Sequence, residues 1–174
     1  HKLSNGYKIR KFTDADLDKT VEINRGCLPE NYSPIFFMDL YRSFPDSFLI
    51  GEYNEEIIGY TMCRIEFGLS EAKRFRFTHK GHIVSVAVMP EHRCKKIALA
   101  MLEEVLKVMT ERYKCNETYL EVRISNQTAI NLYQKMGYSI IKNIPHYYID
   151  GETAAVMFRT LSLETLSNDI KKSI

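Results

Sequence analysis

Residues 82–97, with the sequence HIVSVAVMPEHRCKKI, are the stretch that decides the fold. Apolar side chains occupy both alternating faces of residues 82–89, which predicts a buried central strand. One face of this strand carries His82, Val84, Val86 and Val88, and the other carries Ile83, Ser85, Ala87 and Met89. Pro90 ends the strand, and a short basic loop follows it.

After this loop, the apolar period changes to that of a helix between Ile97 and Tyr113, with Ala98, Met101, Leu102, Val105 and Met109 on one face. Such a helix brings free backbone N–H groups, the positive end of its dipole and the loop's cationic side chains to one place. We therefore predict a site for a phosphate or pyrophosphate. The alternative is a solvated helix cap, because the chain lacks the spacing of a nucleotide P-loop or a dinucleotide fingerprint.

Length and composition are those of an ordinary single-domain protein. The chain has 174 residues, of which 45% are hydrophobic and 26% charged, and a formal net charge of +2, so its charge favours neither nucleic acid nor an anionic membrane. We predict one domain over residues 1–161 and a polar tail over 162–174. The four scattered cysteines form no C-x-x-C pair, which argues against zinc and disulfides. Without an apolar run long enough for a membrane span or a leader, we expect a cytoplasmic protein.

Turn and cap residues divide the remainder into short elements. Further strands are predicted over residues 7–12, 47–53, 57–67, 118–124, 138–144 and 153–161. Further helices are predicted over residues 17–26, ended by Gly26, over 35–43, and between a cap at Ser125 or Asn126 and Gly137. Gly68–Lys80 is interpreted as a long mobile connection. The order β-α-α-β-β-β-α-β-α-β-β predicts a single α/β domain, in which a mixed sheet of about seven strands is flanked by about four helices.

The basic loop and the last predicted helix resemble those of a known family. The loop reads Arg93-Cys94-Lys95-Lys96-Ile97-Ala98, and Asn126 precedes Ala129-Ile130 and Leu132-Tyr133. This arrangement resembles the GNAT acetyltransferase superfamily, whose loop pattern is Q/R-x-x-G-x-G/A. Four further motifs resemble protein N-terminal (Nα) acetyltransferases, most closely archaeal enzymes related to the NatA catalytic subunit: LPENY at 28–32, GHIVSVAV at 81–88, LEVRISN at 120–126 and HYYIDGETA at 146–154. The resemblance extends from Tyr7 to Leu161.

Lys96 departs from the family pattern. The family usually has glycine at this position, since glycine lets the backbone approach a pyrophosphate closely. We expect Lys96 to keep a negative φ and to turn its ammonium group towards the phosphate.

The resemblance implies acetyl-CoA as the cofactor. Its pyrophosphate would lie on the backbone amides of the loop and first helical turn, at Arg93, Cys94, Lys95, Lys96, Ile97, Ala98 and Leu99. Its pantetheine arm would pair like an extra strand with Val86, Ala87 and Val88, and Asn126 would hold this arm. A backbone N–H near Val86 would hold the thioester carbonyl and stabilise the oxyanion. No metal is needed for direct attack by an amine.

The resemblance also implies the groups that carry the chemistry. The substrate's α-amine has a reference pKa of about 7.7–8.0 and needs only a modest base, for which Glu30 and His82 are the candidates. Alternatively, Glu30 is a surface charge of its loop, and His82 is a histidine of the core. Tyr133 would protonate the departing thiolate. We predict that its neighbour Leu132 packs in the core and leaves Tyr133 free for this role.

A peptide groove is implied by residues of two loops, namely Leu28, Pro29, Glu30, Tyr32, Tyr147 and Tyr148. Glu121 and Arg123 share a charged strand face that we expect to line the cleft. The substrates would be protein N-termini, including nascent chains at the ribosome, and the partners would include an auxiliary subunit.

Three alternatives remain open. The fold could acetylate a lysine or another amine, and a lysine pKa of about 10.4 demands a stronger base. It could also bind acyl-CoA without catalysis. A nucleic-acid-binding module would use Lys73, Arg74, Arg76, His79 and Lys80, but a solvated loop, or a docking patch for a ribosome or partner subunit, is the simpler interpretation. We therefore expect no specific nucleic acid and no membrane among the partners.

Overall fold

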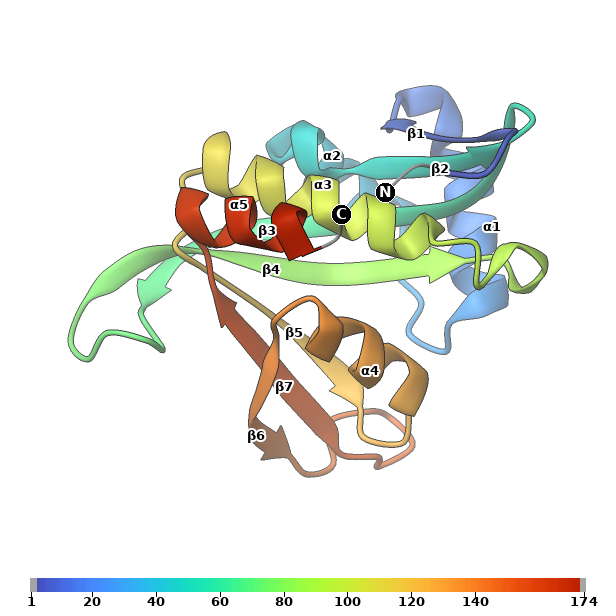
Figure 1. The fold of residues 1–174 in the computed structure, drawn as a ribbon. Helices are drawn as coiled ribbons and strands as arrows, with labels where there is room; N and C mark the ends of the chain where they lie inside the picture. Colours follow the sequence, from blue (N-terminus) through green and yellow to red (C-terminus); the bar gives the residue numbers. More distant parts are fainter. Residues whose placement is uncertain (1–2, 173–174) are drawn as a thin grey trace. The chain divides into compact units, whose positions relative to one another are not determined.

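The computed structural model describes residues 3–172 (Figure 1). The ends of the predicted domain and tail, residues 1–2 and 173–174, lie outside this range. The described part contains seven strands: β1 (Tyr7–Lys11), β2 (Leu49–Tyr53), β3 (Glu56–Leu69), β4 (Phe77–Val88), β5 (Glu117–Arg123), β6 (Ser139–Ile144) and β7 (Ala154–Thr160). It also contains five α-helices: α1 (Leu17–Cys27), α2 (Pro34–Ser43), α3 (Ile97–Glu111), α4 (Gln127–Lys135) and α5 (Leu163–Lys172).

The strands form one mixed sheet in the order β1-β2-β3-β4-β5-β7-β6. β4 and β5 pair in parallel, whereas β1 with β2, β2 with β3, β5 with β7 and β6 with β7 pair antiparallel. The predicted α/β class, mixed sheet and order of elements are confirmed. The fifth helix lies inside the predicted tail, and the domain boundary at residue 161 stays a prediction.

The chain divides into two compact units. The first contains the residues up to Arg64 together with Ile83–Arg112, and the second contains Ile65–His82 together with the residues from Tyr113 on. In the first unit, one apolar core joins α1 and α2 to the strands, through side chains that include Phe12, Val21, Phe37, Leu40, Phe48, Ile50 and Tyr60. α3 packs on β1 and β2, and its predicted apolar face is buried at Met101, Leu102, Val105 and Met109.

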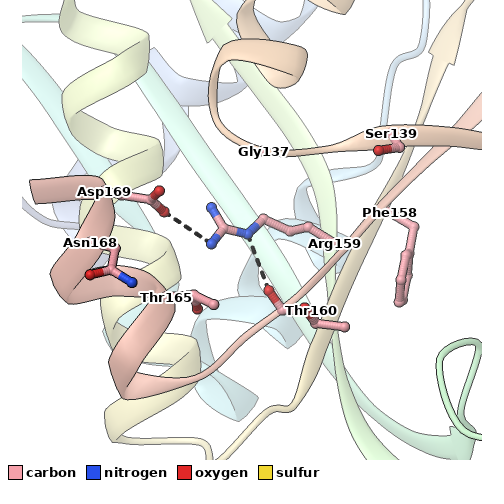
Figure 2. Close-up of a pocket in the computed structure, with 8 residues that line it drawn as sticks. All are labelled: Gly137, Ser139, Phe158, Arg159, Thr160, Thr165, Asn168 and Asp169. Atoms are coloured by element: carbon pink, nitrogen blue, oxygen red, sulfur yellow. Dashed lines mark hydrogen bonds and ion pairs between the residues drawn. The ribbon is translucent and has the colours of Figure 1, made fainter. Parts of the chain in front are cut away.

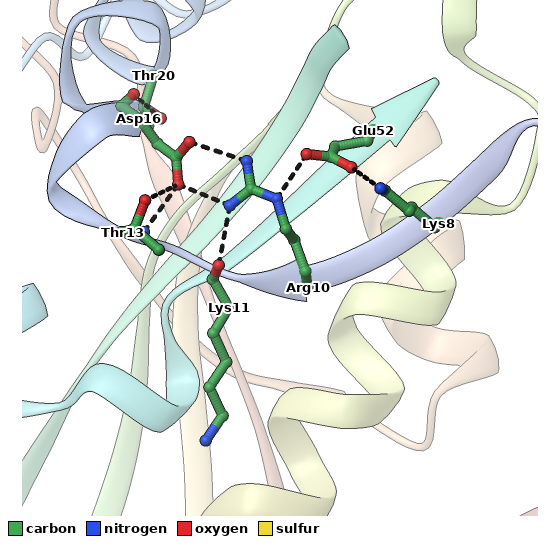
Figure 3. Close-up of polar contacts among 7 residues, drawn as sticks. All are labelled: Lys8, Arg10, Lys11, Thr13, Asp16, Thr20 and Glu52. Carbon is green, nitrogen blue, oxygen red and sulfur yellow. Dashed lines mark hydrogen bonds and ion pairs between the residues drawn. The ribbon is translucent and has the colours of Figure 1, made fainter. Parts of the chain in front are cut away.

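A row of charged side chains ties the start of α1 to β1 and β2 (Figure 3). The Asp16 carboxylate accepts the backbone N–H of Thr13 at 2.7 Å, as in a capping box. The same carboxylate binds the Arg10 guanidinium at 2.7 and 2.8 Å, and Arg10 also pairs with Glu52, which in turn binds Lys8. The hydrogen bond from Arg10 holds the pKa of the Asp16 side chain below its ordinary value.

Gly26 does not end α1, so the predicted role of this glycine is wrong. The helix continues to Cys27, and the N–H of Leu28 still bonds to the carbonyl of Asn24 at 3.0 Å. The side-chain amide of Asn31 then donates to the Leu28 carbonyl at 2.7 Å. Because a side chain supplies this donor, the helix ends without a residue in the left-handed conformation.

The predicted mobile connection at residues 68–80 is also wrong. β3 and β4 are longer than predicted, so that only residues 70–76 separate them, and Figure 1 shows them as a long hairpin. The N–H of Ser70 donates to the Arg76 carbonyl at 2.7 Å across the turn. The buried Glu117 carboxylate accepts the Ser70 hydroxyl and two turn N–H groups, from Glu71 at 3.0 Å and from Ala72 at 3.1 Å. The anchor of the turn is thus far away in sequence, where no local pattern indicates it.

The second unit is built on β5, β7 and β6. On β5, Leu120 and Val122 are buried, whereas Ile124, at the next alternate position, is 45% exposed. Both predicted caps of α4 are confirmed, since the Asn126 side chain accepts the N–H of Ala129 at 3.2 Å and Gly137 has a φ of 87°. Within residues 3–172, no helix combines the length and the apolar character needed to cross a bilayer.

Candidate functional site

In the first unit, the end of β4 and the basic loop are closely tied to each other. The Arg93 side chain donates through Nε to the Val88 carbonyl at 2.9 Å, so this guanidinium holds the loop against the strand end. β3 approaches β4 very closely here, because a Cβ on Gly59 would lie 2.8 Å from the Ala87 carbonyl oxygen. The predicted pantetheine-binding segment, Val86–Val88, is therefore fixed in place by both neighbours.

The loop adopts a conformation that the sequence did not predict. Lys96 has a φ of 65° and a ψ of 14°, so the expected negative φ is wrong. Cys94, two residues earlier, is left-handed as well, with a φ of 59°. The two turns place Lys96 directly before α3, and the first turn of α3 has no side-chain cap. The N–H groups of Ile97, Ala98 and Leu99 remain available for an anion, which fits the predicted phosphate site.

Asn24 organises the segment between α1 and α2. It is fully buried, and its amide nitrogen donates to the Glu30 carbonyl at 3.0 Å. Its amide oxygen accepts the N–H of Tyr32 at 3.2 Å. One side chain thereby fixes the backbone on both sides of Asn31, and with it the predicted groove residues around Glu30. The Tyr32 ring stacks on Phe36 with centroids 4.9 Å apart.

A buried chain of hydrogen bonds continues from Asn24 to the central strand. The amide nitrogen also donates to the Tyr60 hydroxyl at 3.0 Å, and that hydroxyl lies 2.7 Å from the Ser85 hydroxyl on β4. Burial raises the pKa of Tyr60 to about 12, which keeps the phenol protonated as a donor. The network connects the Glu30 segment to the strand that carries Val86.

In the second unit, His82 lies between two carboxylates. Its Nε2 is 2.6 Å from Glu121, and its Nδ1 is 3.6 Å from Glu66. The Tyr119 ring is parallel to the imidazole at 4.4 Å, and the Tyr119 hydroxyl donates to the Glu66 carboxylate at 2.8 and 2.9 Å. The imidazole is thus fixed in its plane by stacking and in its orientation by Glu121, as a general base requires.

Arg123 lies two positions further along the same face of β5, where it pairs with the loop between β6 and β7. Its guanidinium donates to Asp150 at 2.7 Å and to Glu152 at 3.3 Å, and it lies 4.1 Å above the Tyr148 ring. These contacts hold the loop that carries the predicted peptide-binding tyrosines. Tyr147 packs edge-on against Tyr148 and is 45% exposed.

The prediction that Leu132 packs in the core and leaves Tyr133 free is wrong. Tyr133 is buried and meets Tyr138 edge-on at 5.6 Å, whereas Leu132 is only half-buried. The helical turn of α4 directs Tyr133 inward together with Ile130 and Met136. Burial does not remove its hydroxyl as a proton donor, so its predicted role stays a prediction.

A separate hollow of about 430 Å³ lies in the second unit beside Arg159 (Figure 2). None of the predicted site residues lines it. Arg159 is used internally, because its guanidinium donates to the Met136 and Thr160 carbonyls and to Asp169 on α5. This hollow is explained by the attachment of α5 and of the C-terminal end of α4.

Sequence reasoning missed the residues that position the predicted ones. Within each unit the structure brings predicted groups together: Glu30 with Tyr32 in the first, and His82 with Glu121 in the second. The missed partners are Asn24, Tyr60, Ser85, Glu66 and Tyr119. A polar residue on the otherwise apolar face of a predicted helix or strand was the available signal for Asn24 and Ser85.

Comparisons with known proteins agree with this arrangement. A model of the acetyltransferase (GNAT) family matches residues 17–138. The chain is 43% identical over 152 residues to an N-alpha-acetyltransferase of Sulfurisphaera tokodaii, covering 87% of this chain and 91% of that protein. It is 34% identical to the N-terminal acetyltransferase A complex catalytic subunit NAA10 of Arabidopsis thaliana, covering 88% and 77%. The crystal structure of Ard1 from Thermoplasma volcanium is similar with a TM-score of 0.76 and 27% identity, covering 90% and 99%. The chain belongs to the acetyltransferase (GNAT) family.

Proposed function

We propose that this chain transfers the acetyl group of acetyl-CoA to the α-amino group of protein N-termini. The observation that carries the proposal is the oriented His82–Glu121 pair, an imidazole held by a carboxylate at 2.6 Å. An α-amine has a pKa of about 7.7–8.0, so a base of this kind is sufficient to remove its proton at neutral pH. The N-alpha-acetyltransferase relative from Sulfurisphaera tokodaii supports the same activity.

The residues present fit acetyl-CoA, which would supply the activated acetyl group. The uncapped first turn of α3, with the exposed Lys95 and Lys96 before it, would hold the pyrophosphate. Val86–Val88 would pair with the pantetheine arm, and Asn126 would bind it further along. The backbone N–H near Val86 would then stabilise the negative charge that develops on the carbonyl oxygen.

Each polar side chain has a role in this proposal. Glu30 attracts the cationic amine into the groove, and His82 accepts the proton that the amine loses, directly or through water. The amine nitrogen forms the new bond to the acetyl carbon as the bond from carbon to sulfur breaks. Tyr133 would give a proton to the leaving thiolate and regain one from the acetylated nitrogen, which loses its second proton as it becomes an amide. Arg123 acts indirectly, by holding the Tyr147–Tyr148 loop against which the peptide would lie.

The partners follow from this chemistry. Free α-amines are presented by newly made protein chains, so nascent chains at the ribosome are substrates in this proposal, and the cytoplasm is its place of action. An auxiliary subunit is part of the proposal because the relative from Arabidopsis thaliana is the catalytic subunit of a complex.

The test is release of coenzyme A with acetyl-CoA and a panel of short peptides. Peptides beginning with Ser, Ala or Met-Leu are each offered with a free α-amine, and again with a blocked α-amine and an internal lysine. We expect turnover only of the free termini. Equal turnover of the blocked peptides would show a lysine acetyltransferase, and binding of acetyl-CoA without any turnover would show a non-catalytic domain.

Variants assign the roles. His82→Asn should lower kcat/KM by about 100-fold, since general bases contribute roughly 10²–10⁴-fold. Glu30→Gln should raise the KM for the peptide, because it removes the charge that attracts the cationic amine. Glu22→Gln is the matched control, because Glu22 is an exposed carboxylate on α1 that forms an ion pair with Lys19. If Glu30→Gln and Glu22→Gln have equal activity, Glu30 has no part in the reaction.

A further inference from the structure

The far end of the β3–β4 hairpin carries large apolar side chains in solvent. Phe67 is 67% exposed, Phe77 is 65% exposed and Phe75 is 84% exposed, and Leu69 is similarly open. Three cations, Lys73, Arg74 and Arg76, are also exposed at the turn. We refer to these seven residues together with His79 as the hairpin surface. A solvated polar loop does not explain the hairpin surface, because such a loop does not bring several exposed aromatic side chains together.

The rings of the hairpin surface form a row on one face of the two strands. The Phe67 ring stacks on Phe77 with centroids 5.7 Å apart and an interplanar angle of 25°, and it meets the His79 ring at 5.1 Å. The opposite strand face carries Glu66, Lys80 and His82, as the alternation of a strand requires. The row is therefore separate from the polar cluster around His82.

The hairpin surface is ordered, although it is exposed. The buried Glu117 carboxylate holds the turn through Ser70 and two backbone N–H groups. Phe75 has a φ of 59°, a conformation that a bulky residue adopts at a cost, and its ring is directed into solvent under the Arg74 guanidinium at 4.9 Å. The turn thus presents an aromatic ring and a cation together.

The charge of the hairpin surface favours a polyanion. Within residues 3–172, no ion pair involves Lys73, Arg74 or Arg76. The nearby Glu71 is instead 3.4 Å from Lys80. Lys80 also donates to the Leu69 carbonyl and lies over the Tyr119 ring, so it does not belong to the exposed set.

We propose that the hairpin surface binds a segment of single-stranded RNA. Exposed rings on a strand face are stacking platforms for bases, and neighbouring cations follow the phosphates of a single strand. A bilayer fits less well, because three of the four tip residues, 73–76, are charged and would have to enter first. A protein partner is instead one outcome of the test below. This departs from the sequence-based expectation of no specific nucleic acid.

The proposal does not rest on acetyl transfer, and the two are tested separately. Binding of the full chain to fluorescent ten-nucleotide single-stranded RNAs is measured by anisotropy at several salt concentrations. Phe67→Ala with Phe77→Ala should weaken binding about tenfold or more, since stacking contributes roughly 1–3 kcal/mol per base. Lys73→Gln, Arg74→Gln and Arg76→Gln together should weaken binding and lower the salt slope by roughly 0.7 for each phosphate that is no longer neutralised.

Matched controls use residues of the same kind elsewhere on the surface. Lys107, Lys142 and Lys171 are exposed and are changed to Gln together, and Ile140 and Leu163 are changed to Ala as exposed apolar residues. All variants should keep the coenzyme A release and the unfolding temperature of the parent chain. Equal RNA affinity of hairpin and control variants would overturn the proposal. So would tighter binding to anionic phospholipid vesicles or to poly-glutamate than to RNA, if that binding depended on Phe67 and Phe77 in the same way.

Discussion

Asn24→Ala tests whether a buried amide positions the Glu30 segment. The substitution removes donors to the Glu30 carbonyl and the Tyr60 hydroxyl, both at 3.0 Å, and the acceptor for the Tyr32 N–H at 3.2 Å. At about 1 kcal/mol per hydrogen bond, the free energy of unfolding should fall by about 3 kcal/mol. The Tyr60 hydroxyl retains Ser85 as a partner. The two loop groups would be satisfied by water, and the segment would move.

The activity should change in a specific way. A displacement of about 1 Å at a substrate-positioning group can cost roughly 100-fold. We therefore expect Asn24→Ala to raise the KM for the peptide and to lower kcat, while the KM for acetyl-CoA stays within about twofold, because the predicted phosphate loop makes no contact with Asn24. Tyr60→Phe should have a smaller effect, since it leaves both loop hydrogen bonds in place.

Thr20→Val is the control for stability alone. Thr20 is fully buried on the same helix, and its hydroxyl donates to the Asp16 carbonyl at the start of that helix at 2.8 Å. Unfolding by guanidinium chloride and steady-state coenzyme A release, both at 25 °C, give the two quantities. If Asn24→Ala loses stability but keeps the peptide KM and kcat of Thr20→Val, the network is purely structural and the argument fails.

Three further predictions concern other parts of the chain. Lys96→Gly should raise the free energy of unfolding by about 0.5–1 kcal/mol, because it relieves a left-handed φ, whereas the control Lys95→Gly should not. Thermal unfolding measures both variants, and equal shifts in the unfolding temperature would show that Lys96 is not strained. The pKa of Asp16 is lowered by Arg10, so the ion pair contributes its full stability above the ordinary value of 3.8 and loses it as the pH falls below that value. Arg10→Gln should therefore cost about 2 kcal/mol at pH 7 and flatten the acid side of a stability–pH curve, and an unchanged curve would contradict this. Glu117→Ala should speed trypsin cleavage within residues 70–76 by about tenfold, with native gels and unchanged coenzyme A release confirming the fold.

The sheet, and the strand, loop and helix between His82 and Tyr113, could be predicted because the sequence patterns that indicate them are local. The apolar faces of residues 82–89 and the helical period after Ile97 are properties of neighbouring residues, and the structure confirms both. The caps at Asn126 and Gly137 were visible for the same reason, since each depends on a few adjacent backbone groups.

The failures share a different physical cause. Gly26 continues a helix because Asn31 supplies a donor from outside it, and the 70–76 turn is ordered because Glu117 reaches it from another strand. The negative φ expected for Lys96 rests on the type of its side chain alone. The turn before α3 requires a left-handed residue at this position, whatever its side chain is. Residues that only the tertiary structure brings together produce no local pattern in the sequence from which their contact could be predicted.

The Glu117 anchor has a consequence for how the chain is made. The β3–β4 hairpin is local in sequence, yet the carboxylate that closes its turn lies 47 residues beyond Ser70. During synthesis, the hairpin strands can meet as soon as residue 88 has left the ribosome, but the turn stays without its anchor until β5 has followed. The turn can therefore reach the form seen here only after β5 has followed, so its order depends on the second half of the sheet.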